Sequence, residues 1–151
     1  MKKAICFLFV LCLVPIKSFA GQTGKLGVGL AIGEPFGPTV KYWINEKQAV
    51  NLGIGLEDDG IFYGDYLWHG WQSPTQPAAG KVGFYTGIGL RFENEEHGED
   101  KSGFRVPLGI NLLFNRSPIE LFGEIVPVMQ FSPESDLTLD GAIGGRVYFG
   151  H

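Results

Sequence analysis

The chain has little cysteine and little charge. Only two of its 151 residues are cysteines, Cys6 and Cys12, and both fall within the first twenty residues. The rest of the chain therefore has no disulfide, no thiol nucleophile and no cysteine ligand for a metal. Charged residues make up only 19% of the chain. The apolar run at residues 4–16 is shorter than the ~20 residues that a membrane-spanning helix needs. The short length favours a single domain.

The first twenty residues have the features of a secretory signal peptide. Lys2 and Lys3 precede the apolar run, and the small residues Ser18 and Ala20 stand at the positions before a cleavage site. Lipidation is not favoured, because Cys12 lies inside the apolar run. We therefore expect a cleaved signal peptide over residues 1–20 and one domain over residues 21–151. That domain keeps nine basic and sixteen acidic residues, a net charge of −7. Such a balance argues against nucleic acid as a partner.

From residue 26 onward, apolar residues alternate with small or polar ones. A period of two is typical of β-strands, and no segment shows a helical period. Most prolines fall between the segments, whereas Pro107 and Pro127 fall within them and predict bulges or strand ends. The pattern predicts eight strands, and their apolar face carries these residues: Leu26, Val28, Leu30, Ile32; Val40, Tyr42, Ile44; Val50, Leu52, Ile54, Leu56; Phe62, Tyr66, Trp68; Val82, Phe84, Thr86, Ile88, Leu90, Phe92; Phe104, Val106, Leu108, Ile110, Leu112, Phe114; Ile119, Leu121, Ile125; Leu137, Leu139, Ile143, Val147, Phe149.

The two faces of these strands indicate a membrane barrel. Eight strands of about 9 to 11 residues would use roughly 80 residues of the mature chain and leave enough for the connections. The apolar faces carry almost no charge, while the opposite faces carry glycine and ions. A water-soluble barrel has the reverse arrangement. The sequence therefore predicts an all-β protein, an eight-stranded antiparallel up-and-down transmembrane β-barrel in the cell outer membrane.

Three segments, at residues 33–43, 65–69 and 140–144, carry a resemblance to a known group, together with the alternating final strand that ends in Tyr148 and Phe149. The chain resembles a family of small bacterial outer-membrane proteins whose fold is like the OmpA transmembrane barrel. The resemblance covers nearly all of residues 24–149. It implies the fold and the outer-membrane location, and it supplies no functional site.

The predicted interior is packed and ionic. Glycines on three of the strands are expected to leave room for long side chains from their neighbours. Buried charges must be paired, so we expect a salt-bridge network that fills the barrel and leaves no open pore. A gated ion path is the alternative. The charged residues expected to face inward are Lys41, Arg91, Arg105 and Arg146, with Glu57, Asp65, Glu120, Glu124 and Asp140.

The two ends of the barrel differ in aromatic residues and in charge. The loops after the first, third, fifth and seventh strands sum to −10, and the opposite turns sum to +2. This predicts an acidic outer rim, although the length of the connection at residues 70–80 leaves the inverted orientation open. Two aromatic girdles are expected, one of Tyr42, Trp43, Trp68, Trp71 and Tyr148, and one of Phe36, Phe62, Phe92, Phe104 and Phe131.

No catalytic, cofactor-binding or metal site is predicted. The acidic run at residues 93–100 fits no calcium-loop template. His97, with Ser102 and Glu99, is the only outward catalytic candidate, and all three lie in one loop without a rigid support. His69 is expected to cap the ionic interior, and His151 lies at the inner end.

We therefore expect a non-enzymatic outer-membrane protein with a structural or surface-interaction role. Its expected partners are outer-membrane lipid, lipopolysaccharide and an extracellular protein that contacts the acidic loops. A soluble periplasmic barrel that binds an apolar ligand, and a lipid-modifying outer-membrane enzyme, are the alternatives.

Overall fold

A computed structural model of the chain describes residues 26–57, 60–72, 75–95 and 98–149. The predicted signal peptide, residues 1–20, lies outside these residues. No helix in the described part of the chain is long and apolar enough to cross a membrane. The elements are β1 (Leu26–Gly33), β2 (Gly37–Trp43), β3 (Gln48–Gly55), β4 (Ile61–Gly70), β5 (Gly80–Glu93), β6 (Lys101–Arg105), β7 (Leu108–Phe114), β8 (Ile119–Ser132) and β9 (Asp136–Phe149).

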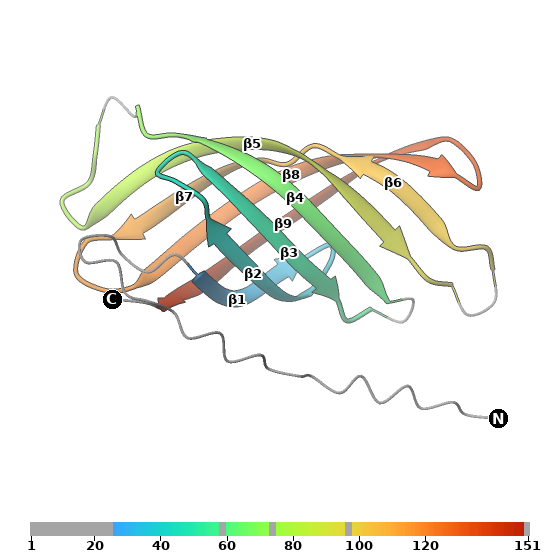
Figure 1. Cartoon of the computed structure of the whole chain (residues 1–151), viewed down its shortest axis with the longest axis horizontal. Coiled ribbons are helices and arrows are strands. Elements are labelled where there is room, and N and C mark those ends of the chain that lie inside the picture. Colours follow the sequence, from blue (N-terminus) through green and yellow to red (C-terminus); the bar gives the residue numbers. More distant parts are fainter. Residues whose placement is uncertain (1–25, 58–59, 73–74, 96–97, 150–151) are drawn as a thin grey trace.

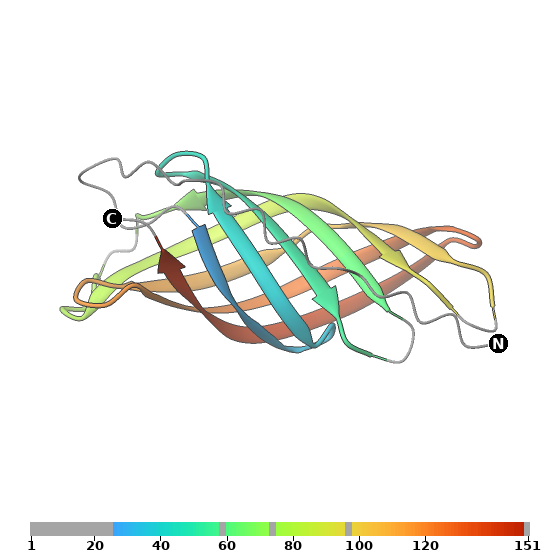
Figure 2. The same cartoon turned by 60° about the horizontal axis from the view of Figure 1, so that its bottom comes forward.

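These strands close into an eight-stranded antiparallel barrel (Figures 1 and 2). Consecutive strands pair along the chain, and β1 pairs with β9 from Leu26 opposite Phe149 to Gly33 opposite Ala142. Strands β6 and β7 both pair with β5 and with β8, so they are two parts of one barrel strand. The predicted fold is confirmed.

Of the two prolines predicted to mark bulges or strand ends, Pro107 fits the prediction and Pro127 does not. Pro107 lies between β6 and β7, where the sequence predicts a bulge or a strand end, and it marks a strand end without an inserted residue. The pairing of β5 keeps one alignment across the interruption, with Thr86 opposite Leu108 and Gly89 opposite Arg105. The prediction for Pro127 is wrong, because this residue lies inside β8 opposite Leu139.

The position of Pro127 has a simple physical reason. Its carbonyl accepts a hydrogen bond of 3.0 Å from the backbone nitrogen of Val106. The N–H and C=O groups of a residue in an antiparallel strand point to the same neighbour. The missing N–H of Pro127 therefore faces the interruption between β6 and β7, and the pairing of β8 with β9 loses nothing.

The predicted faces of the strands are confirmed. Apolar side chains cover the outside of the barrel, with exposed fractions of 52% for Leu30, 61% for Ile88 and 65% for Ile143. Charged side chains lie inside, where Lys41 and Glu120 are fully buried. The barrel is therefore inverted relative to a water-soluble protein, in which apolar residues form the interior.

One of the two predicted aromatic girdles is correct only in part. The five phenylalanines are all exposed on the outer face, as expected. Tyr42 and Trp68 also point outward, but Tyr148 is buried and Trp43 packs against Trp71 with ring centroids 5.8 Å apart. Trp43 and Tyr148 lie two residues from Lys41 and Arg146 and so share their inward face. Trp71 folds back over the barrel end, where its Nε1 donates a 2.7 Å hydrogen bond to the carbonyl oxygen of Glu46.

Candidate functional site

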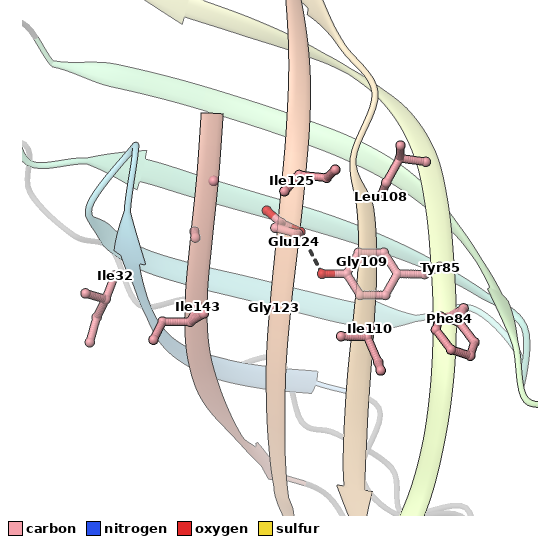
Figure 3. Close-up of a pocket in the computed structure, with 12 residues that line it drawn as sticks. Ile32, Phe84, Tyr85, Leu108, Gly109, Ile110, Gly123, Glu124, Ile125 and Ile143 are labelled. Carbon is pink, nitrogen blue, oxygen red and sulfur yellow. Dashed lines mark hydrogen bonds between the residues drawn. The ribbon is translucent and has the colours of Figure 1, made fainter. Parts of the chain in front are cut away.

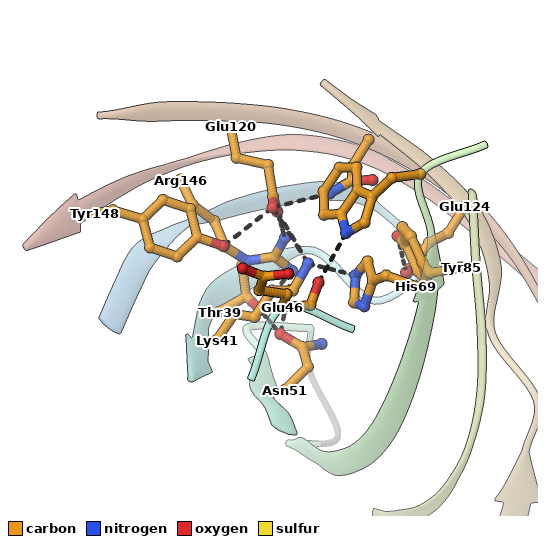
Figure 4. A network of polar contacts seen from close by, with 12 residues as sticks. Thr39, Lys41, Glu46, Asn51, His69, Tyr85, Glu120, Glu124, Arg146 and Tyr148 are labelled. Atoms are coloured by element: carbon orange, nitrogen blue, oxygen red, sulfur yellow. Dashed lines mark hydrogen bonds and ion pairs between the residues drawn. The ribbon is translucent and has the colours of Figure 1, made fainter. Parts of the chain in front are cut away.

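The barrel interior contains a three-residue ionic cluster, shown in Figure 4. It lies near the end of the barrel where β1 begins and β9 ends. Glu120 of β8 lies between Lys41 of β2 and Arg146 of β9. The Glu120 Oε2 atom is 3.2 Å from Lys41 Nζ, and Oε1 is 2.5 Å from Arg146 Nη1. All three side chains are buried, so one carboxylate serves two cations in a region with little water. We call this group the Glu120 cluster.

Neutral side chains complete the Glu120 cluster. Tyr148 OH and Asn111 Nδ2 donate hydrogen bonds of 3.0 and 3.2 Å to Glu120 Oε2. Arg146 Nη2 donates to Asn51 Oδ1 at 3.1 Å and to Thr39 Oγ1 at 3.3 Å. Hydrogen bonds of this kind satisfy buried charges that would otherwise be costly. Residues from five strands, β2, β3, β7, β8 and β9, thus meet around the Glu120–Arg146 ion pair.

A second cluster, which we call the Arg105 cluster, occupies another part of the interior. Arg105 of β6 has its Nε 2.8 Å from Asp65 Oδ1 and its Nη2 3.6 Å from Glu124 Oε1. The guanidinium also lies 4.0 Å from the centroid of the Tyr63 ring. Tyr85 OH donates a 2.7 Å hydrogen bond to Glu124 Oε2. The cluster has two acids and one base, and its formal charge of −1 offsets the +1 of the Glu120 cluster.

A third ionic group, toward the opposite end, corrects one predicted residue. Arg91 pairs with Asp140 and, at 3.2 Å, with Glu93 Oε2. The alternation predicts Glu57 in the interior, but Glu93 lies there. Glu57 is exposed beyond the end of β3, where its Oε1 accepts a hydrogen bond from the backbone nitrogen of Phe36. Side chains alternate between the two faces only within a strand, and Glu57 lies beyond the end of β3. The other eight predicted inward charges do face the interior.

The inward glycines leave room for large side chains, as predicted. A Cβ atom at Gly53 or Gly109 would overlap the rings of Tyr63 or Tyr85. At Gly83 it would lie 2.6 Å from Cε3 of Trp71. These aromatic rings therefore lie directly on the backbone of the opposing strands, and glycine is required there by packing.

Three rings, those of Trp43, His69 and Trp71, close the end of the barrel where β1 begins and β9 ends. We call them the aromatic lid. His69 packs against both Trp43 and Trp71, with ring centroids 4.3 and 5.9 Å away. Its Nε2 is 2.9 Å from Lys41 Nζ. His69 is buried and caps the ionic interior, where its partner is Lys41 of the Glu120 cluster and not Asp65, the partner expected from the sequence.

The outer wall carries a groove, shown in Figure 3. It has a volume of about 710 Å³ and lies on the outward side of β5, β7, β8 and β9, with Ile32 of β1 at its edge. Gly123 and Gly141 leave its floor without side chains. Its apolar rim is formed by Ile32, Phe84, Leu108, Ile110, Ile125 and Ile143. This groove has no signal in the sequence, because it depends on which outward glycines become neighbours across strands.

Of the catalytic candidates, only Glu99 and Ser102 lie among the described residues. His97 and His151 lie outside the described residues. Glu99 is exposed, and Ser102 is half-buried at the start of the β6 region. Among residues 26–57, 60–72, 75–95 and 98–149, no group of three or more His, Asp or Glu side chains could hold a metal ion. The charged groups of the interior are engaged with one another, and their arrangement is that of a packed ionic core.

Comparison with models of protein families found no match, and comparison with curated proteins found none. Among solved structures, the chain is similar to the N-terminal β-barrel domain of Pseudomonas aeruginosa OprF. The identity is 10% and the TM-score 0.53, over 82% of this chain and 95% of that domain. This likeness concerns the fold, and it agrees with the expected OmpA-like barrel.

Proposed function

We propose that the protein is an integral outer-membrane β-barrel with a structural or surface-interaction role, without catalytic activity and without an open pore. The observation that carries this proposal is the inversion of the two faces. Apolar side chains cover the outside, whereas Lys41, Arg105 and Glu120 lie inside. The similar β-barrel domain of OprF supports the barrel fold on which the proposal depends. The rival function, a soluble barrel that binds an apolar ligand, needs apolar side chains on the inner face.

The height of the apolar surface fits a bilayer. On β9 the outward apolar residues run from Leu137 to Phe149. Twelve steps of about 3.3 Å cover roughly 40 Å along the strand. A tilt of about 40° reduces this to a height of roughly 30 Å, close to the ~25 Å apolar band of outer-membrane barrels. Membrane lipid, including lipopolysaccharide, is the partner that we propose for this surface.

The decisive experiment is fractionation of cells combined with gel migration of boiled and unboiled samples. We expect the protein in the outer-membrane fraction and a band that shifts on heating, because a folded membrane barrel resists SDS until it is heated. Release with the soluble periplasm, together with a band that does not shift, would contradict the proposal.

We propose that the acidic end of the barrel faces the exterior. Strands β1, β3, β5 and β8 end at this end and are followed in the sequence by the acidic connections, and in Figure 1 the paired ends of β8 and β9 extend far there. The longest connection, residues 71–79, follows β4, which ends at the other end of the barrel. Acidic loops favour a basic surface on an extracellular protein partner.

Labelling of introduced cysteines on intact cells tests this orientation. A cysteine at Ser135 should react with a thiol reagent that does not cross the membrane, whereas the control cysteine at Asn45 should not.

The absence of an open pore is tested at Arg105. Replacing Arg105 with Met leaves the Asp65 and Glu124 carboxylates without their counterion. We expect the free energy of unfolding to fall by about 3 to 5 kcal/mol. Conductance of the purified barrel in planar bilayers should stay near the baseline of the native protein. A gain in conductance without a loss of stability would favour the gated ion path instead.

A further inference from the structure

The outer groove has a feature that the fold itself does not require. A Cβ atom at Gly123 would lie 3.7 Å from its nearest neighbour, Cγ2 of Ile143, and one at Gly141 would lie 3.6 Å from the carbonyl oxygen of Glu124. Both distances are ordinary van der Waals contacts. The inward glycines differ, since a side chain at Gly53 or Gly109 would collide with a tyrosine ring. The groove therefore exists because two side chains are missing at positions that could accept them.

The floor of the groove is closed toward the interior. Gly109 and Glu124 are paired across β7 and β8. The Tyr85 ring lies against the inner side of Gly109, and its hydroxyl is bonded to Glu124 (Figure 3). The Glu124 carboxylate also faces Arg105. The polar groups beneath the floor are thus engaged with one another inside the barrel, and the concave space is left to its apolar rim.

We propose that this groove is a binding site for an acyl chain of a membrane phospholipid. The inference rests on the proposed membrane location. The groove is continuous with the apolar surface that faces the bilayer, and its volume of about 710 Å³ lies within the 300–1,000 Å³ typical of ligand pockets. Its outward side chains are all uncharged, which complements a hydrocarbon chain. A second copy of the barrel presents a rigid convex wall, so a flexible chain follows this shallow, open groove better.

The experiment uses the mature barrel, refolded in detergent micelles and titrated with a palmitoyl-oleoyl phosphatidylethanolamine, with bound lipid counted by native mass spectrometry. We expect the native barrel to retain lipid at low stoichiometry. The double variant Gly123→Leu/Gly141→Leu fills the groove and should weaken retention at least tenfold. The milder Gly123→Ala/Gly141→Ala variant should have an intermediate effect, and it keeps the test valid if the larger residues impair folding.

Gly145→Leu is the matched control. Gly145 lies on β9 like Gly141, points outward, does not line the groove, and would accept a Cβ with nearest neighbours at 3.5 Å. This variant should retain lipid as the native barrel does. Equal retention in all variants would overturn the proposal, and so would a native dimer that the groove-filling variants abolish. Either result would contradict the lipid site in the groove. If the barrel were still membrane-inserted and heat-modifiable, the proposed function would not be contradicted.

Discussion

Replacing Glu120 with Gln is expected to lower the free energy of unfolding by about 3 to 5 kcal/mol, because removal of one member of a buried ionic group leaves its partners uncompensated. Lys41 and Arg146 both depend on this carboxylate, and their side chains are 0% and 3% exposed. Glutamine keeps the size and a hydrogen-bond acceptor but removes the charge, so the effect reports on charge rather than on a cavity. Unfolding in urea, followed in detergent micelles, measures the change.

A double variant separates the charge effect from local packing. The native Glu120 cluster has a formal charge of +1. The single change raises it to +2, and adding Lys41→Met returns it to +1. Partial recovery of stability is therefore expected in Glu120→Gln/Lys41→Met. The control is Glu134→Gln at an exposed turn, which should change stability by less than about 0.5 kcal/mol. A loss at Glu120 no larger than at Glu134 would mean that the cluster contributes little.

The period of two was enough to predict the barrel wall and most of its interior. Position within the alternating pattern assigned eight of the nine predicted inward charges correctly, with Glu57 as the exception, and it also assigned the glycines beside them. The alternation fails where a strand ends. Glu57 lies two residues beyond the end of β3, and Glu93, still within β5, pairs with Arg91 inside the barrel. Rules of alternation apply to extended backbone, and the chain leaves this conformation at the turns.

The specific partners inside the barrel could not be predicted from the sequence. Lys41 and Glu120 are 79 residues apart, and they meet because β2 and β8, with β1 and β9 between them, both point side chains into the closed barrel. Which acid meets which base depends on the offset of each strand along its neighbours, and short turns do not determine this offset across the barrel. The lid formed by Trp43, His69 and Trp71 depends on a connection that folds back. The outer groove also depends on strand register, because the register decides that Gly123 and Gly141 lie close together on the outer face.

The seam between β1 and β9 gives the sharpest test of the packing role of glycine. Gly29 of β1 and Gly145 of β9 lie at this seam, but only Gly29 has no space for a side chain. A Cβ at Gly29 would overlap the carbonyl oxygen of Gly145 and lie 2.7 Å from Cα of Arg146. These are backbone atoms, so the collision can be relieved only by separating the strands that close the barrel.

Gly29→Ala should therefore lower the free energy of unfolding by about 3 kcal/mol, the upper part of the range for overpacked sites. The temperature at which the folded band disappears on unboiled gels should fall with it. Gly145→Ala adds the same methyl group on the opposite strand, where the nearest atoms are 3.5 Å away, and it should be nearly neutral. Because both variants lose the same backbone freedom in the unfolded chain, their difference isolates the collision. Equal free energies of unfolding for Gly29→Ala and Gly145→Ala would mean that β1 and β9 can move apart at little cost. Glycine at position 29 would then not be needed for their close approach.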